Sequence, residues 1–213
     1  MKALVVTDKH KMELQDIPKP EIKPGKVLIK VAYCGICGSD LPRYFEGGVH
    51  AFPQVLGHEF SGTVEAIGEG VSTISVGEKV AVAPLVPCGT CENCQKGEPA
   101  MCTQYSFIGS REQGAMAEYV VVPEKNCVKV PDTLSLKEAA LLEPLTVAIH
   151  GIERVRVPAG AEVLVLGAGT IGLLTVLALR AIGVGKIIVV DLNDKKLTLA
   201  KKIGADEDRK SVV

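Results

Sequence analysis

The 213-residue sequence predicts an all-β, barrel-like region followed by an α/β region with a parallel, doubly wound sheet. Residues up to about 150 are rich in Gly and Pro and contain short apolar runs with little helical periodicity, as strands bounded by turns do. From Ala161 onward, apolar runs alternate with helical stretches, which is the order that builds a parallel sheet. We therefore expect two domains, residues 1–150 and 151–213.

Four runs of the first region are typical of strands. Each is short and apolar and is bounded by turn residues. The runs are 26–32, 62–67, 79–83 and 119–122.

The second region begins with an apolar run at 163–166, which we expect to be a strand buried on both faces. The turn Gly167-Ala168-Gly169-Thr170-Ile171-Gly172 follows, and then a helical stretch to about Ala181. The whole stretch 163–179 carries no charge. We expect a buried strand and helix there and no membrane span, because the stretch is slightly short and contains glycines.

The remaining pattern is a strand at 186–190 that ends at Asp191, and a helix at 194–203 with Gly204 as its stop signal. Residues 206–213 give no clear third strand. A complete doubly wound fold needs two such halves, so we expect this chain to be a fragment of that fold.

The composition excludes several function classes. The chain has 24 basic and 25 acidic residues and 4% aromatic residues, which provides neither a basic surface for nucleic acid or an anionic membrane nor a platform for base stacking. The N-terminus lacks the plan of a signal peptide. Seven cysteines without such a signal indicate a reducing compartment and metal binding, and we expect a cytoplasmic location.

Four of these cysteines, Cys88, Cys91, Cys94 and Cys102, form a C-x2-C-x2-C-x7-C pattern. Four thiolates on one turning loop suit a tetrahedral zinc ion. A closed shell of four sulfurs leaves no open position, so this zinc would be structural. An iron–sulfur cluster is the alternative that the spacing also allows.

A second set of donors is scattered along the chain. Cys37, His58, Glu59 and Glu143 offer one thiolate, one imidazole and carboxylates. Such a mixed set suits a catalytic zinc that keeps one position open for substrate. Each residue alone is a weak signal.

The chain resembles the zinc-containing medium-chain dehydrogenases, which include alcohol, sorbitol and threonine dehydrogenases. The resemblance rests on Gly35-Ile36-Cys37-Gly38-Ser39-Asp40, Gly57-His58-Glu59-Phe60-Ser61-Gly62, the four-cysteine loop, and the Gly-rich turn with Asp191. It implies a GroES-like β-barrel catalytic domain followed by the first half of a Rossmann domain. It also implies a homo-oligomeric full-length protein.

By this resemblance, Cys37, His58 and Glu143 are ligands of a catalytic zinc, and Glu59 is a ligand or lies one water away. Two zinc ions per chain and NAD are the implied cofactors. The implied reaction is hydride transfer from a secondary alcohol to NAD, with the Ser39 hydroxyl passing the proton outward. Cys34 and Cys127 match no ligand position, and we expect both to be ordinary buried cysteines.

The Gly-rich turn follows an apolar strand, opens a helix and precedes an acidic residue at the end of the next strand, which together indicate a dinucleotide site. Gly167 permits the turn, Gly169 lets a pyrophosphate approach, and Gly172 allows close packing. The free N–H groups at the helix N-terminus suit phosphates. Asp191 would bind the adenosine ribose and disfavour the 2′-phosphate of NADP, and Lys196 matches a position that often contacts the same ribose.

A glutamate at position 143 points to the polyol branch of the family. The stretches Ser39-Asp40-Leu41-Pro42-Arg43 and Phe107-Ile108-Gly109-Ser110-Arg111 resemble the subgroup that oxidises galactitol 1-phosphate. Arg43 and Arg111 are our candidates for binding a substrate phosphate, because guanidinium pairs bidentately with phosphate. The alternatives are a dehydrogenase of sorbitol, xylitol or a small diol, a zinc-free reductase, and a zinc-binding fragment without catalysis.

Overall fold

The computed structural model describes residues 1–210. The chain divides into two compact units, Met1–Glu143 and Pro144–Val213. The predicted boundary at 150/151 lies inside helix α4 (Leu142–Val155), a helix that the sequence pattern did not indicate. Each unit has its own buried core.

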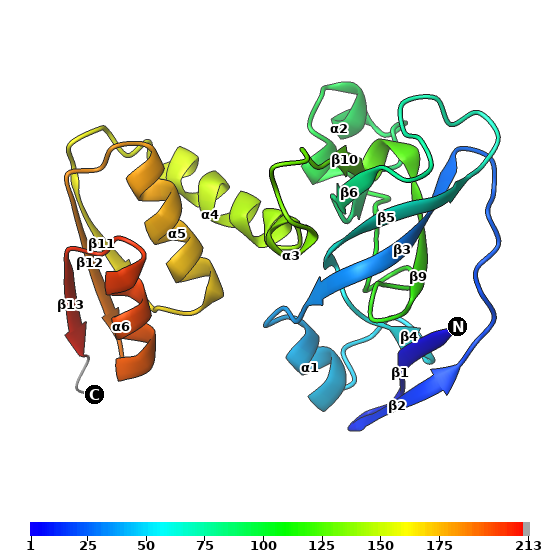
Figure 1. Cartoon of the computed structure of the whole chain (residues 1–213), viewed down its shortest axis with the longest axis horizontal. Helices are drawn as coiled ribbons and strands as arrows, with labels where there is room; N and C mark the ends of the chain where they lie inside the picture. Colours follow the sequence, from blue (N-terminus) through cyan, green and yellow to red (C-terminus); the bar gives the residue numbers. More distant parts are fainter. Residues whose placement is uncertain (211–213) are drawn as a thin grey trace. The chain divides into compact units, whose positions relative to one another are not determined.

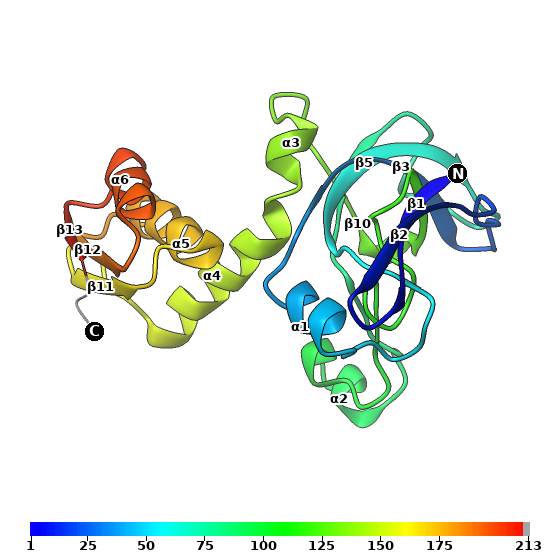
Figure 2. The same ribbon diagram turned by 90° about the horizontal axis from the view of Figure 1, so that it is seen from below.

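The first unit is built on a five-stranded antiparallel sheet with the order β10-β6-β5-β3-β9. Figures 1 and 2 show the long strands β3 and β5 curving through this unit. All four predicted strands are confirmed within it. The bounds are β3 (Lys26–Gly35), β5 (Glu59–Ile67), β6 (Lys79–Val82), β9 (Tyr119–Pro123) and β10 (Cys127–Lys129).

Smaller elements surround this sheet, and none of them was among the predicted strands. Two further sheets have the orders β2-β1-β4 and β7-β8. The remaining elements are short: β1 (Lys2–Asp8), β2 (Lys11–Asp16), β4 (Gln54–Val55), β7 (Leu85–Val86), β8 (Ser106–Phe107), α1 (Asp40–Phe45), α2 (Glu92–Gln95), η1 (Pro99–Met101), η2 (Glu124–Asn126) and α3 (Leu136–Ala139).

The core of the first unit comes from alternate residues of the central strands. Val27 and Ile29 on β3 and Phe60 and Val64 on β5 are each 1% exposed or less. Alternation places them on one face of the sheet, where they pack together. Truncating a ring such as that of Phe60 to Ala would cost about 3–5 kcal/mol. This packing fixes the adjacent ends of β3 and β5, which bear the candidate site.

The second unit contains a parallel sheet with the order β11-β12-β13. Its elements beyond α4 are β11 (Glu162–Leu166), α5 (Thr170–Ala181), β12 (Lys186–Asp191), α6 (Asp194–Lys202) and β13 (Glu207–Lys210). The predicted strand–helix–strand–helix order is confirmed.

The expectation of no third strand is wrong, because β13 pairs with β12 from Ile188↔Glu207 to Asp191↔Lys210. Its sequence, EDRK, carries only charged side chains, so it shows no apolar pattern. Backbone pairing and the Lys186–Glu207 ion pair at 2.6 Å hold it in place. The end of the stretch without a predicted strand, 211–213, lies outside the described residues.

The expectation that the first strand of this unit is buried on both faces is also wrong. Val165 is 8% exposed, but Leu164 and Leu166 are 57% and 76% exposed. The strand lies at the edge of its sheet, and one of its faces stays open within residues 1–210. Apolar runs therefore predicted the strand correctly and its environment incorrectly.

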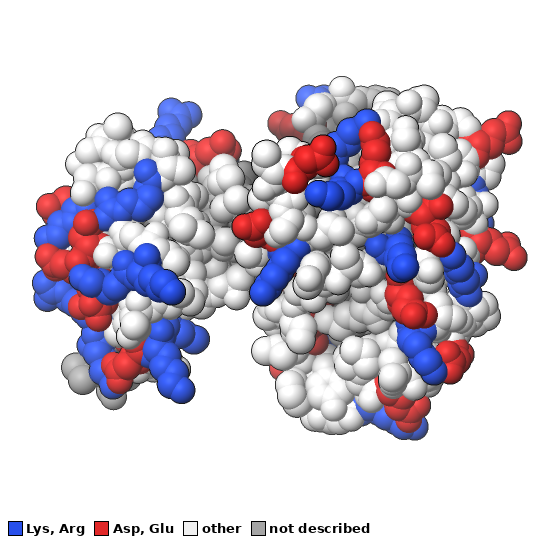
Figure 3. Space-filling model, in the orientation of Figure 1, with Lys and Arg blue, Asp and Glu red and all other residues white. Residues whose placement is uncertain are grey.

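Basic and acidic side chains are interspersed on the face shown in Figure 3, which agrees with the formal net charge of −1. Among the described helices, none has the length and apolar character that crossing a membrane requires. The uncharged stretch at 163–179 forms β11, the Gly-rich turn and most of α5, as predicted.

Candidate functional site

The four cysteines of the predicted structural site converge in the loop between β7 and β8. Their four sulfur atoms lie within 4.8 Å of one another. The Sγ atoms of Cys88 and Cys94 are 4.0 Å apart, and those of Cys91 and Cys102 are 3.8 Å apart. Sulfurs bound tetrahedrally at the usual zinc–sulfur distance lie about 3.8 Å apart, so the cluster fits a zinc ion. Figure 2 shows α2 and its loop projecting from the sheet.

Hydrogen bonds to sulfur prepare this loop for a cation. The Cys88 sulfur accepts the Cys91 N–H at 3.3 Å, the Thr90 N–H at 3.5 Å and the Thr90 hydroxyl at 3.6 Å. The Thr90 hydroxyl and these two N–H groups lower the pKa of Cys88 to about 5. Desolvation and the neighbouring cysteines raise the pKa of Cys94 to about 12. Four thiolates can therefore share this space only when a cation offsets their charge.

The second cluster brings together Cys37, His58 and Glu59, whose ligand atoms lie within 4.8 Å of one another. Strand register explains the contact. Gly35 at the end of β3 pairs with Glu59 at the start of β5, so Cys37 just after β3 lies beside His58 just before β5. The sheet thus joins residues that are distant in sequence.

Gly57 makes the sharp entry into β5 possible. Its φ of +99° favours glycine. A Cβ there would lie 2.6 Å from the Cys34 sulfur and 3.0 Å from the Met116 backbone nitrogen. A larger residue would displace His58, which follows directly.

Asp40 is a residue of this site to which the sequence analysis gave no role. It is 3% exposed, and its Oδ2 accepts the Cys37 N–H at 3.0 Å. Its Oδ1 lies 3.8 Å from His58 Nδ1, a buried atom without a hydrogen-bond partner in the described structure. In the sequence, only its position three residues after Cys37 indicated that Asp40 could belong to the site. The burial of its carboxylate could not be predicted from spacing.

The electrostatics of His58 suit a metal ligand. Burial lowers the pKa of His58, and the carboxylates of Asp40 and Glu59 oppose this shift. The neutral imidazole is the form that binds metal. Both His58 and Glu59 are buried, at 5% and 6% exposure. The thiol of Cys37, the imidazole of His58 and the buried Glu59 carboxylate together fit a divalent ion.

Glu143 opens α4 at the end of the first unit. Burial and the nearby Glu59 carboxylate raise the pKa of Glu143 to about 7. This effect places the two carboxyl groups in each other's field, although Glu143 does not belong to the Cys37–His58–Glu59 group whose ligand atoms lie within 4.8 Å of one another. A cation between them would remove their repulsion.

Ser39 and the two predicted substrate arginines have different surroundings. Arg43 Nη1 donates to the Ser39 hydroxyl at 2.7 Å and to Asp40 Oδ1 at 3.3 Å. Arg111 instead lies over the Tyr105 ring, 4.3 Å from its centroid. Phe107, in a motif quoted for its resemblance alone, places its ring 5.5 Å from the His58 ring in an edge contact.

The Gly-rich turn in the second unit has the geometry of a phosphate cradle. Gly167 has φ +96°, and a Cβ on Gly172 would collide with the Gly167 carbonyl oxygen. Space around Gly169 is open. Helix α5 begins there without a side-chain N-cap, which leaves the N–H groups of its first turn, from Thr170 and Ile171 onward, for an anion.

Asp191 faces this turn from the end of β12. Its Oδ2 accepts the Ala168 N–H at 2.7 Å, and its Oδ1 accepts the Asn193 N–H at 2.8 Å. These bonds lower the pKa of Asp191, and the Lys196 cation adds to the effect. The carboxylate is thus held ionised and oriented, and each oxygen retains a lone pair for a further donor.

Cys34 and Cys127 are partly rather than fully buried. Burial raises the pKa of each thiol to about 12, and the carboxylates of Asp40 and Glu59 add to the shift at Cys34. Both are therefore poor nucleophiles, as expected of ordinary cysteines.

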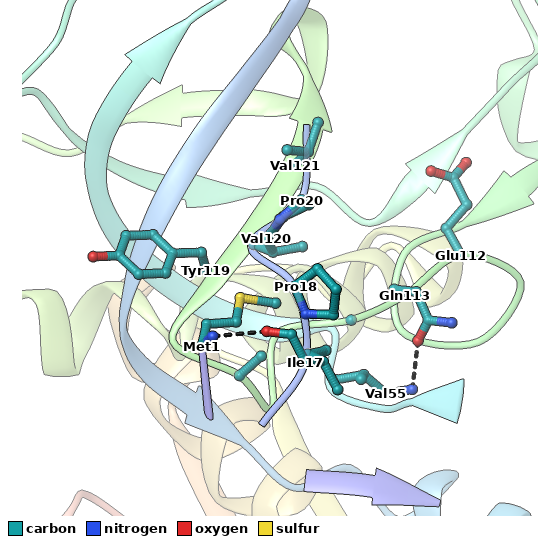
Figure 4. A pocket seen from close by; sticks show the side chains of 12 residues that line it. Met1, Ile17, Pro18, Pro20, Val55, Glu112, Gln113, Tyr119, Val120 and Val121 are labelled. Atoms are coloured by element: carbon teal, nitrogen blue, oxygen red, sulfur yellow. Dashed lines mark hydrogen bonds between the residues drawn. The ribbon is translucent and has the colours of Figure 1, made fainter. Parts of the chain in front are cut away.

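A separate cavity of about 290 Å³ lies in the first unit between the N-terminus and β9. Figure 4 shows its largely apolar lining, with the Met1 amine donating to the Ile17 carbonyl at 2.7 Å. Neither cluster of metal-binding side chains contributes to its wall. Both groups of candidate metal ligands therefore lie outside that cavity.

Residues 23–132 match the alcohol dehydrogenase GroES-like domain. The chain belongs to the zinc-containing medium-chain dehydrogenase family. The predicted family and fold class are thereby confirmed. The 213-residue chain spans about half the length of the curated relatives it matches.

Among these relatives is galactitol 1-phosphate 5-dehydrogenase of Escherichia coli K12, with 44% identity over 87% of this chain and 54% of that protein. A structure from Sinorhizobium meliloti, described as a zinc-binding dehydrogenase bound to NADP, matches with TM-score 0.94 and 35% identity, over 98% of this chain and 61% of that one. An E. coli alcohol dehydrogenase complexed with NADH matches with TM-score 0.91 and 38% identity, over 99% and 62%. The expected zinc and nicotinamide cofactors agree with these relatives.

Proposed function

We propose that the protein oxidises a secondary alcohol of a polyol or polyol phosphate to a ketone and transfers the hydride to NAD. The observation that supports this most directly is the convergence of Cys37, His58 and Glu59 within 4.8 Å. In this proposal Cys37, His58 and Glu143 hold a catalytic zinc, with Glu59 as a ligand or one water away. The four cysteines 88, 91, 94 and 102 hold a second, structural zinc.

When bound, the catalytic zinc would act as a Lewis acid that lowers the pKa of the substrate hydroxyl. The chain's own residues do the rest. Asp40 fixes the Cys37 backbone and faces His58. The Ser39 hydroxyl accepts the Arg43 N–H, which leaves its own proton to pass outward. Asp40, His58 and Glu59 are themselves buried, so their side chains are shielded from bulk water.

For the cofactor, we propose that the pyrophosphate of NAD lies on the turn 167–172 and that its ribose binds Asp191 and Lys196. The ionised, oriented carboxylate of Asp191 supports a preference for NAD, since it would repel a 2′-phosphate. Because one solved relative carries NADP and another NADH, the preference needs a direct test. Replacing Asp191 with Ser should reduce the preference for NAD over NADP by at least about tenfold, measured as the ratio of kcat/KM values.

Galactitol 1-phosphate, with tagatose 6-phosphate as the product, is the substrate that we propose. It is favoured by the similarity to the E. coli enzyme of that name and by Arg43 and Arg111 as phosphate-binding candidates. The alternative substrates are sorbitol, xylitol and 2,3-butanediol. The same proposed zinc ligands would serve for their oxidation, and none of them needs a phosphate-binding arginine. We also propose a cytoplasmic homo-oligomer.

Metal analysis followed by a parallel assay tests this function. We expect two zinc ions per chain and NAD reduction with galactitol 1-phosphate at a kcat/KM above that with galactitol or sorbitol. One zinc per chain would contradict the catalytic centre. Two zinc ions with faster oxidation of the free polyols would keep the dehydrogenase and replace its substrate.

A further inference from the structure

The buried carboxylate of Asp40 carries a negative charge that the side chains of Cys37, His58 and Glu59 do not offset. This residue is 3% exposed, and a buried carboxylate without a partner is strongly disfavoured. One oxygen accepts the Cys37 N–H at 3.0 Å, and the other lies 3.8 Å from His58 Nδ1. The Arg43 guanidinium, 3.3 Å from Oδ1, is the cation that offsets this charge among the described salt bridges.

The position of Arg43 on α1 makes this contact local. Arg43 follows Asp40 by one helical turn, so the two side chains lie on the same face of α1. The arginine side chain is 19% exposed, and its Nη1 also donates to the Ser39 hydroxyl at 2.7 Å. One nitrogen atom thus joins the carboxylate behind His58 to the hydroxyl assigned to proton transfer.

We propose that Arg43 is a positioning residue for the Cys37–His58–Glu59 centre and acts through Asp40 and Ser39. This inference rests on the proposed function, because it assumes that these ligands bind a metal. Arg43 pairs with the Asp40 carboxylate through Oδ1, the oxygen that lies 3.8 Å from His58 Nδ1, and so holds that oxygen in place. A carboxylate in that place fixes the orientation and the tautomer of the metal-binding imidazole. Through the same nitrogen, Arg43 orients the Ser39 hydroxyl so that its proton faces away from the guanidinium.

Cobalt binding tests this role without relying on turnover. Co²⁺ would be titrated against a competing chelator, and its d–d absorption at the mixed-ligand centre differs from that of the four-sulfur site. We expect Arg43→Ala to weaken Co²⁺ binding at the mixed-ligand centre by about 10- to 100-fold and to shift its d–d band. The four-sulfur site should keep its affinity. Arg43→Lys should recover part of the loss, and Arg154→Ala on α4 serves as a control with an exposed arginine.

A double-mutant cycle separates positioning from a general structural effect. In an Asp40→Asn background the carboxylate is absent, so Arg43→Ala should cause little further loss of Co²⁺ affinity. Additive losses would overturn the proposal. So would an unchanged affinity and spectrum in Arg43→Ala with only a higher KM for galactitol 1-phosphate, which would make Arg43 a phosphate ligand alone.

Two further outcomes are distinct. If the unmodified protein binds Co²⁺ only at the four-sulfur site, the proposed function itself fails. If Arg43→Ala does not fold, Arg43→Gln, which removes the charge and keeps much of the side-chain length, and Asp40→Asn carry the test. Arg43→Gln with unchanged cobalt affinity and spectrum, set against a clear loss in Asp40→Asn, would assign the positioning to Asp40 without Arg43.

Discussion

The two metal-binding clusters of the first unit are assembled in opposite ways. The four-cysteine cluster lies within a single loop between β7 and β8. The Cys37–His58–Glu59 cluster forms where the end of β3 meets the start of β5, and the Glu143 carboxyl at the start of α4 lies close enough to feel the charge of Glu59. The first needs only a loop that turns correctly, whereas the second needs the packed sheet.

The two clusters also differ in the types of ligand that they contain. The four-cysteine set is uniform, and backbone N–H groups and the Thr90 hydroxyl stabilise its sulfurs. Four sulfur ligands would complete a tetrahedron and leave no place for substrate. The second set is mixed and only partly buried, and it includes two carboxyl groups that repel one another. Local assembly therefore accompanies the proposed structural role, and assembly through the sheet accompanies the proposed reactive role.

Removing one cysteine from each cluster should separate activity from stability, and this is the largest effect that we expect. Cys37→Ser should reduce kcat/KM by about 10³-fold or more, because Lewis-acid stabilisation of several kcal/mol is lost, with little change in melting temperature. Cys91→Ser should lower the free energy of unfolding by several kcal/mol. Kinetics and thermal melts of both variants, with metal analysis, would measure this. If both variants lost the same property, the division of roles would be wrong.

Replacing Ser39 tests whether proton transfer at the proposed reactive cluster can be separated from zinc binding. Ser39→Ala should reduce kcat by about 10²-fold, since a positioned proton-transfer group contributes that much, while both zinc ions remain bound. Single-turnover kinetics and zinc content would be measured together. Unchanged turnover would exclude Ser39 from proton transfer, and Ser39→Thr, which keeps the hydroxyl, should retain most of the activity.

A pH-dependent stability should mark the reactive cluster in the metal-free protein. Burial and Glu59 raise the pKa of Glu143 from 4.5 to about 7, so the unfolded chain ionises this group first. Stability should therefore fall as pH rises from about 4.5 to 7 and then level off, by on the order of 1–2 kcal/mol after allowing for solvent screening.

Denaturant unfolding of the metal-free protein at several pH values would measure this slope. Glu143→Gln should abolish it, whereas Glu153→Gln at an exposed position of α4 should not. A slope that survives in Glu143→Gln would assign it to another group. Zinc should also remove it, because the metal binds the ionised carboxylate.

The smallest effect concerns the sulfur-bound hydroxyl of the structural cluster. Thr90→Val removes the 3.6 Å contact from Oγ1 to the Cys88 sulfur but keeps the backbone donor. We expect zinc release to a chelator to become a few-fold faster, in line with about 0.5–1 kcal/mol for one hydrogen bond. Thr103→Val is the control, because Thr103 acts on Cys91 through its backbone N–H. Equal release rates for both variants would remove any role of the Thr90 hydroxyl.

The sequence alone determined the features that depend on neighbours along the chain. The cysteine spacing predicted the convergence of Cys88, Cys91, Cys94 and Cys102, because a short loop limits how far its ligands can separate. The apolar runs predicted β3, β5, β6 and β9, and the glycines of the turn 167–172 predicted the start of α5. The third strand was not predicted because β13 has only charged side chains, and backbone pairing with β12 leaves no apolar pattern in the sequence.

Only the tertiary structure decided the contacts that depend on sheet register and burial. The pairing of Gly35 with Glu59 brings Cys37 to His58, and no spacing in the sequence encodes that register. Burial gives Asp40 its role and raises the pKa of Glu143. The same packing holds Arg43 against Ser39 and Asp40. Desolvation is a property of the surroundings of a side chain, so the residue type alone could not reveal it.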